Sequence, residues 1–191
     1  LDRFEIPPYG YFDGYANRNS LIYSSTYGIE GIPTIYRGTL RRPNYCQGWD
    51  VFIQLGMTDD SYAMTNSETL TPRSFLNAFL PYELHTSVED KFKKVLGEEN
   101  AFLFEQFESM GIFDDSFTYG IENASPAKLL QRLLEPKWKL ESGDKDMLVM
   151  YHEFEYLINN EQKKITSSLV NLGVDEVYTA MSNTVGLPVA I

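Results

Sequence analysis

Three arginines fall within six consecutive residues, in the segment YRGTLRR that spans residues 36–42. Alternation along the strand predicted for residues 34–41 places Arg37, Thr39 and Arg41 on one face. A guanidinium binds a carboxylate through two parallel hydrogen bonds, and a threonine hydroxyl adds a donor or acceptor beside it. Gly38 would let a backbone or a ligand approach closely. The pattern indicates either a site for a carboxylate-bearing ligand or ion pairs with the 27 acidic residues of the chain.

A second polar cluster, Ala16-Asn17-Arg18-Asn19-Ser20, stands directly before a helix that we expect Ser20 to cap and Gly28 to end. The beginning of a helix is a favourable place for an anion. Taken together, the two clusters predict an anion-binding cleft with several arginines that recognise carboxylates.

Other residues that could carry chemistry form no recognisable site. The chain has no glycine-rich turn of the dinucleotide-binding or P-loop type. His85, His152 and Cys46 lie far apart in the sequence, so we predict no metal site, a sheet histidine at 152 and a structural thiol at 46. The acidic pairs at 59–60 and 114–115 could suggest paired carboxylates, but nothing in the sequence brings them together. No proton-transfer residue is identified.

Composition limits the class of protein. The net charge of -11 and the sequence pI near 4.6 argue against nucleic acid or an anionic membrane as partners. One cysteine allows no internal disulfide and favours a reducing, cytoplasmic location. No run of 18 apolar residues is present, so we predict no membrane-spanning segment. The chain does not begin with Met and stops within an apolar segment, so we expect it to be a piece of a longer protein.

The predicted elements that must position these residues alternate at first between strand and helix. Residues 11–19 are extended, and a strand over 34–41 is followed by a helix over 45–57. Residues 59–140 predict a helical insertion of about four short helices. Residues 146–172 predict a hairpin with its turn at Asn159-Asn160 and a central first strand, and residues 177–191 predict a helix interrupted at Gly186 and Pro188. The fold class is α/β (α+β): a mixed β-sheet with flanking helices and a helical insertion.

Several motifs resemble those of one enzyme family. GYANRNS (14–20) followed by IYRGTLRR (35–42) resembles the GYPNRDS and RGTLRY pair of saccharopine dehydrogenases of the L-glutamate-forming type. The segments KDMLVMYHEFEY (145–156), TSSLVNLG (166–173) and YTAMSNTVGLPVAI (178–191) resemble the closing part of the same family. The resemblance extends from about Tyr9 to Ile191, and it is tight at both ends and loose between Ser61 and Leu140.

The resemblance implies that residues 1–191 form the substrate-binding and homodimer-forming domain of such an enzyme. The family's Rossmann domain, which binds NAD or NADP, would be absent from this chain, and the isolated chain would be inactive. The family oxidises saccharopine, an amino acid with three carboxylates, to L-glutamate and 2-aminoadipate 6-semialdehyde in lysine metabolism. A related carboxynorspermidine dehydrogenase and a non-enzymatic anion-binding or assembly domain are the alternatives.

The family pattern also implies roles for individual residues. Arg18 would bind one carboxylate of the substrate, while Arg37, Gly38 and Thr39 would bind a second. Asn17 is expected to assist, and the pattern extends weakly to Arg41. Two positions depart from the family: Asn19 stands where Asp is frequent, and Arg42 stands where an aromatic residue is common. The choice between NAD and NADP is open.

Overall fold

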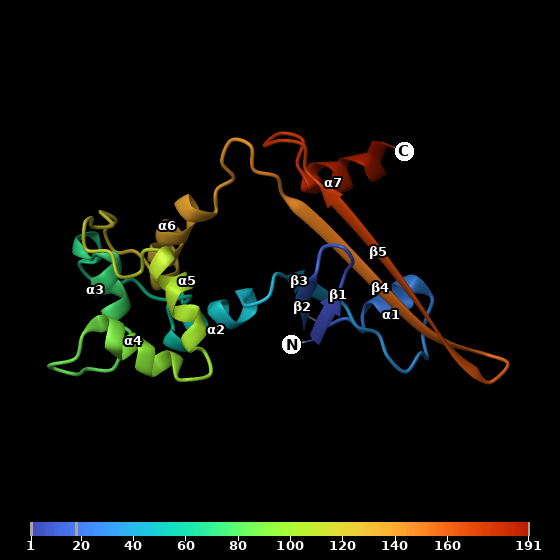
Figure 1. Cartoon of the computed structure of the whole chain (residues 1–191), viewed down its shortest axis with the longest axis horizontal. Helices are drawn as coiled ribbons and strands as arrows, with labels where there is room; N and C mark the ends of the chain where they lie inside the picture. The colour runs from blue at the N-terminus through green and yellow to red at the C-terminus, as the bar shows by residue number, and fades with distance from the viewer. Residues whose placement is uncertain (1, 18, 191) are drawn as a thin grey trace. The chain divides into compact units, whose positions relative to one another are not determined.

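The computed structural model describes residues 2–17 and 19–190, with only the backbone for residues 187–190. The chain divides into two compact units (Figure 1). The helical unit is formed mainly by Arg41–Trp138, and the sheet unit combines Arg3–Leu40 with Lys139–Ile191. The fold is mixed α/β, as the sequence predicts.

The sheet unit contains a three-stranded sheet, a long hairpin and two helices. In the first sheet the strand order is β1-β2-β3, with α1 between β2 and β3 in the sequence. The hairpin of β4 and β5 forms a second, antiparallel sheet, which α7 follows. The bounds are β1 Asp2–Glu5, β2 Tyr11–Ala16, α1 Tyr23–Tyr27, β3 Gly38–Arg41, β4 Met147–Ile158, β5 Glu161–Leu172 and α7 Ala180–Ala190.

The hairpin turn lies where the sequence predicts it. Asn159 and Asn160 both have positive φ, 52° and 63°, which is the backbone that a two-residue hairpin turn requires and that asparagine tolerates. The turn fixes a register that runs from Met147 opposite Leu172 to Ile158 opposite Glu161. The prediction that the first arm is a central strand is wrong, because within the described residues β4 pairs with β5 alone.

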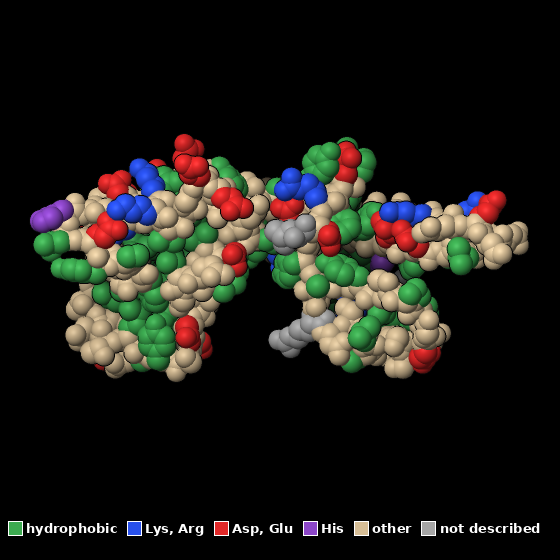
Figure 2. Space-filling model, turned by 90° about the horizontal axis from the view of Figure 1, so that it is seen from below, with side chains coloured by type: hydrophobic (Ala, Val, Ile, Leu, Met, Phe, Trp, Pro, Cys, Tyr) green, Lys and Arg blue, Asp and Glu red, His purple; other side chains and the backbone are tan. Residues whose placement is uncertain are grey.

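The two faces of the hairpin differ in polarity. On one face Glu153 pairs with Lys164 at 2.8 Å, and acidic and basic side chains lie next to one another along the hairpin in Figure 2. The register places a set of large apolar side chains on the other face, where they are 44–57% exposed. We call this set the hairpin apolar face: Met150, Phe154, Ile165 and Leu169.

The helical unit is built from short helices that begin and end at recognisable signals. Thr71 and Ser74 form a reciprocal capping box in front of α3, and the Ser87 hydroxyl accepts the Asp90 backbone N–H at 3.0 Å. Gly56 ends α2 with a left-handed backbone. The bounds are α2 Tyr45–Leu55, η1 Ser67–Thr69, α3 Pro72–Asn77, α4 Val88–Leu96, η2 Ala101–Leu103, α5 Phe104–Ser109 and α6 Pro126–Trp138.

Aromatic rings dominate the core of the helical unit. Phe107 packs edge-on against Phe52 and Phe92, with ring centroids 5.1 and 5.0 Å apart. The apolar stripe of α6 is buried in the same cluster, and it consists of Leu129, Leu130, Leu133 and Leu134. These side chains join helices that are each too short to be stable in isolation.

Three predictions about these elements are wrong. The strand predicted from residue 34 begins at Gly38, and the helix predicted from Ser20 begins at Tyr23 without a side-chain cap. The backbone of α7 continues through Gly186 and Pro188, where the sequence predicts an interruption. Pro136 likewise lies inside α6. A proline in the last turns of a helix removes only one hydrogen bond, and neighbouring packing can compensate for that loss.

Tyr119 offers a direct test of the core. Its side chain is 5% exposed, and its hydroxyl has no hydrogen-bond partner among the described residues, while burial raises the pKa of the phenol. Replacing Tyr119 by phenylalanine removes the unsatisfied hydroxyl and keeps the ring against Phe75. We therefore expect the free energy of unfolding to rise by about 1 kcal/mol. Urea unfolding measures this free energy, and Tyr62→Phe, at an exposed side chain, is the control. A loss of stability in Tyr119→Phe would show that the Tyr119 hydroxyl has a partner.

Candidate carboxylate-binding site

The segment after β2 and the segment that enters β3 lie against each other in the sheet unit. The backbone N–H of Asn17 donates to the carbonyl oxygen of Arg37 at 2.8 Å. The Thr39 hydroxyl donates to the side-chain oxygen of Asn17 at 2.7 Å. Because Thr39 donates to the Asn17 oxygen, the amide nitrogen of Asn17 points away from Thr39 and can donate to a ligand. The structure thus brings Asn17, Arg37, Gly38 and Thr39 together.

Gly38 has a structural reason for being glycine. A Cβ at this position would lie 2.7 Å from the carbonyl oxygen of Tyr15 and 2.9 Å from the ring of Tyr36. The carbonyl oxygen of Tyr15 belongs to the backbone of β2, so it cannot move away without disturbing the sheet. The close approach expected from the sequence is therefore an approach of protein backbone, which keeps β3 tight against β2.

The guanidinium of Arg37 is exposed and stacked. Its central carbon lies 3.8 Å from the ring centroid of Tyr23 in α1, and the Arg37 backbone N–H donates to the Ser20 hydroxyl at 3.2 Å. No carboxylate in residues 2–17 and 19–190 forms an ion pair with Arg37. Of the two interpretations that the sequence left open, internal ion pairing is therefore not realised for Arg37.

Two predicted site residues remain. Arg41 is the last residue of β3, at the boundary between the two units, and its guanidinium carbon is 5.6 Å from the ring centroid of Tyr45. Arg18 lies outside the described residues. Sequence reasoning missed Tyr23; the available signal was a pair of tyrosines, Tyr23 and Tyr27, four residues apart in the helix that follows the polar cluster.

Other candidate groups have ordinary surroundings. His152 is exposed on β4 and stacks on Phe154 with ring centroids 6.0 Å apart. Cys46 is half-buried, and the described part of the chain holds no group of three or more potential metal ligands. Asp59 accepts the Ser61 backbone N–H at 2.7 Å, and Asp60 accepts the hydroxyl of Ser125. Asp59 therefore organises its own loop, and Asp60 ties that loop to the residue that precedes α6.

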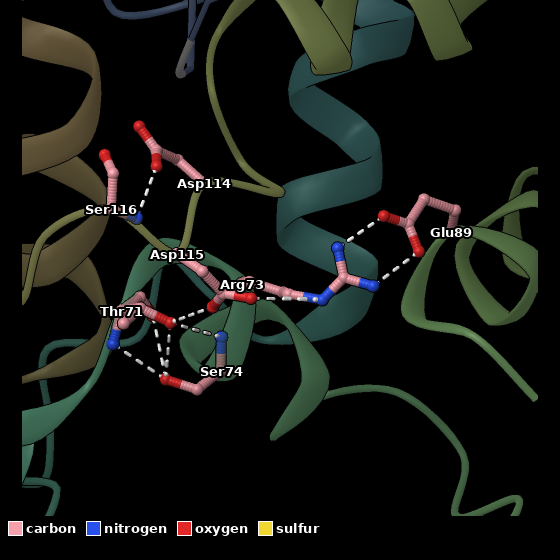
Figure 3. A network of polar contacts seen from close by, with 7 residues as sticks. All are labelled: Thr71, Arg73, Ser74, Glu89, Asp114, Asp115 and Ser116. Atoms are coloured by element: carbon pink, nitrogen blue, oxygen red, sulfur yellow. Dashed lines mark hydrogen bonds and ion pairs between the residues drawn. The ribbon is translucent and has the colours of Figure 1, made fainter.

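The second acidic pair joins a network around Arg73 (Figure 3). The Arg73 guanidinium forms a two-pronged pair with Glu89, in which Nη2 and Oε2 are 2.6 Å apart. Its Nε lies 3.5 Å from Asp115, which also accepts the Thr71 hydroxyl at 2.7 Å. Asp114 accepts the Ser116 backbone N–H at 2.7 Å. The network ties α3 to the start of α4, so its role is structural.

This network predicts a pH dependence of stability. The hydrogen bond from Arg73 holds the pKa of Glu89 below its usual range, in spite of the opposing effect of burial. A lowered pKa in the folded state means that the stabilisation is complete above the unfolded value of about 4.3 and is lost as pH falls through the folded pKa. We expect Glu89→Gln to lower the free energy of unfolding by about 1 kcal/mol at pH 7.

Urea unfolding of the wild type and Glu89→Gln between pH 7 and pH 3 measures this contribution. The difference between the two proteins should shrink at the acid end of the range. The exposed Glu98→Gln serves as the matched control and should show no difference. A constant difference for Glu89→Gln across the whole range would rule out the charge of Glu89 as its origin.

Comparison with known proteins agrees with this mixed α/β architecture. A family model described as "Saccharopine dehydrogenase C-terminal domain" matches residues 2–191. The chain therefore belongs to the saccharopine dehydrogenase C-terminal domain family, and the resemblance seen in its motifs is confirmed. In the described residues no helix is both long enough and apolar enough to cross a membrane.

Individual relatives match almost the whole chain. The L-glutamate-forming saccharopine dehydrogenase of Saccharomyces cerevisiae, whose name specifies NADP(+), is 28% identical to this chain. The match covers 96% of this chain and 44% of the yeast protein. The mitochondrial alpha-aminoadipic semialdehyde synthase of Bos taurus is 30% identical over 97% of this chain and 21% of its own. The apo structure of the yeast dehydrogenase covers 100% of this chain and 44% of that chain, with a TM-score of 0.84 and 28% identity. This chain thus spans less than half the length of these relatives.

Proposed function

We propose that this chain is the substrate-binding part of an oxidoreductase that converts saccharopine to L-glutamate and 2-aminoadipate 6-semialdehyde with NAD or NADP, in lysine metabolism. Family membership supports the reaction class. The observation that carries the substrate assignment is the exposed Arg37 guanidinium, which has no carboxylate partner among the described residues and is held beside Asn17 and Thr39. Saccharopine offers three carboxylates to such a cluster.

The role of this chain in the reaction is to hold and orient the substrate. Arg37 can bind one carboxylate through the two N–H groups at the edge of its fork. The Asn17 amide, held by Thr39, can donate a further hydrogen bond to the same group. Arg18 is predicted to bind a second carboxylate. Fixing an end of a flexible substrate in this way reduces the orientational freedom that opposes reaction at its centre.

The residues of this chain do not fit a dinucleotide site. The sequence contains no glycine-rich turn between a strand and a helix. We therefore place NAD or NADP on a further domain, outside this chain, and expect residues 1–191 to be inactive alone. The dinucleotide, when bound, would accept a hydride from the substrate.

The test is to assay the full-length protein for saccharopine-dependent formation of NADPH and of NADH. Turnover with either dinucleotide supports the proposal, and the ratio of the two rates assigns the cofactor. Turnover with carboxynorspermidine but not with saccharopine would establish the alternative enzyme. Turnover with neither substrate would leave a non-enzymatic anion-binding domain and overturn the proposed reaction.

Two finer parts of the proposal concern assembly and location. We propose that the full-length protein forms a homodimer, because the hairpin apolar face exposes four large side chains that water solvates poorly. Sedimentation of the full-length protein measures its oligomeric state, and a monomer at micromolar concentration would contradict the proposal. A cytoplasmic location stays a prediction from the single cysteine.

A further inference from the structure

The guanidinium of Arg37 stacks on a tyrosine ring that stacks in turn on a second tyrosine. Its central carbon lies 3.8 Å from the ring centroid of Tyr23, and Tyr23 in turn stacks on Tyr27 with centroids 5.8 Å apart and planes inclined by 24°. The two tyrosines stand four residues apart on α1, so they lie one above the other on the same face of the helix. We call this stack the Arg37 ladder.

The ladder uses the flat face of the guanidinium and leaves its edge free. The N–H donors of arginine lie in the plane of the group, so a ring over the face blocks none of them. The backbone of Arg37 is held as well, because its N–H donates to Ser20 at 3.2 Å and its carbonyl oxygen accepts from Asn17 at 2.8 Å. Both ends of a long and otherwise flexible side chain are thereby fixed before any ligand arrives.

We propose that Tyr23 is a positioning residue for carboxylate binding. Its ring orients the Arg37 guanidinium by stacking on it, while Tyr27 supports the Tyr23 ring. The identity of the carboxylate as part of saccharopine rests on the proposed function. A pre-oriented fork loses less side-chain freedom when the ligand binds, so the ladder contributes to affinity without touching the substrate. The ladder also selects arginine over lysine, since an ammonium has neither a flat face nor a fork.

Steady-state kinetics of the full-length protein with saccharopine tests the proposal. Tyr23→Leu removes the ring, and we expect KM to rise about three- to tenfold with kcat changed less than about twofold, because the loss is in binding alone. Tyr23→Phe keeps the ring and should restore the wild-type KM. Tyr27→Leu should have a smaller effect than Tyr23→Leu. Tyr82→Leu, at a side chain 86% exposed in the helical unit, is the matched control and should change neither constant.

A double replacement separates positioning from general damage to the fold. In an Arg37→Ala background the ladder has nothing to orient, so adding Tyr23→Leu should raise KM no further. An unchanged KM in Tyr23→Leu overturns the proposal. So does a loss in Tyr23→Phe equal to that in Tyr23→Leu, or a further rise in the double variant equal to that of Tyr23→Leu alone.

A chemical readout keeps the ladder testable without turnover. Phenylglyoxal modifies guanidinium groups, and mass spectrometry of the digested full-length protein reports the rate at Arg37. A stacked guanidinium should react more slowly than a mobile one, so Tyr23→Leu should speed modification of Arg37 and Tyr23→Phe should not. Absence of saccharopine turnover in the wild type would defeat the proposed function alone, whereas equal modification rates in wild type and Tyr23→Leu would defeat the ladder.

Discussion

Replacing Arg37 by alanine in the full-length protein is expected to raise KM for saccharopine by about 30-fold or more. The substitution removes a two-pronged, charge-assisted contact and leaves a substrate carboxylate without its partner. Loss of such a contact costs about 2–4 kcal/mol when the site is shielded from water. Because the structure pairs Arg37 with no carboxylate of the described residues, its removal should leave the fold nearly as stable as before.

Initial rates against saccharopine at saturating dinucleotide measure this effect. Arg37→Lys should recover only part of the loss, since it keeps the charge but has no fork and cannot stack on Tyr23 in the same way. Arg132→Ala is the matched control, because Arg132 is an exposed arginine of α6 in the helical unit. An unchanged KM in Arg37→Ala would remove Arg37 from the substrate site.

Elements that depend on neighbouring residues alone were predictable from the sequence. Thr71 followed by Pro72 marks the beginning of α3, and Ser87 marks the beginning of α4. The pair Asn159-Asn160 fixes the hairpin turn because few other residues accept two successive left-handed conformations. Each of these signals acts within about four residues, so no knowledge of the tertiary structure is needed to recognise it.

Features that depend on distant parts of the chain were not predictable in the same way. The pattern of β4 has apolar residues on both faces at its start, which in a sequence is typical of a central strand, yet β4 has a single partner among the described strands. Helix α7 continues through Gly186 and Pro188 although both residues disfavour helix interiors. Local propensity sets a preference of about 1–3 kcal/mol at such positions, and tertiary packing can exceed it.

The candidate site also has parts that local patterns predict and a part that depends on the tertiary structure. Alternation and the family motif together singled out Asn17, Arg37 and Thr39, and the structure brings these three into contact through hydrogen bonds. Their binding of a carboxylate stays a prediction. The position of the Tyr23 ring against the Arg37 guanidinium depends on how the segment between β2 and β3 folds back, which the four-residue spacing of Tyr23 and Tyr27 does not specify.

The helical unit has a core of its own, and this has a consequence for unfolding. The buried cluster among the described residues draws its members from Val51 to Leu134, all within the helical unit. Phe92 is a member of this cluster with 0% exposure, and its ring contacts Phe107 and Phe113 at centroid distances of 5.0 and 5.7 Å. Truncation of Phe92 would therefore leave a cavity lined by rigid rings that cannot easily move in to fill it.

Phe92→Ala is expected to lower the free energy of unfolding of the helical unit by about 3–5 kcal/mol, because buried aromatic surface is lost and a cavity remains. Hydrogen exchange in the full-length protein measures it: backbone amides of α4, α5 and α6 should exchange faster, while those of the β4–β5 hairpin keep their rates. Val95→Ala, at a 37% exposed side chain of the same helix, should have a much smaller effect. Equal acceleration in the helices and in the hairpin would contradict separate cores, and it would show that residues 41–138 unfold together with the rest of the chain.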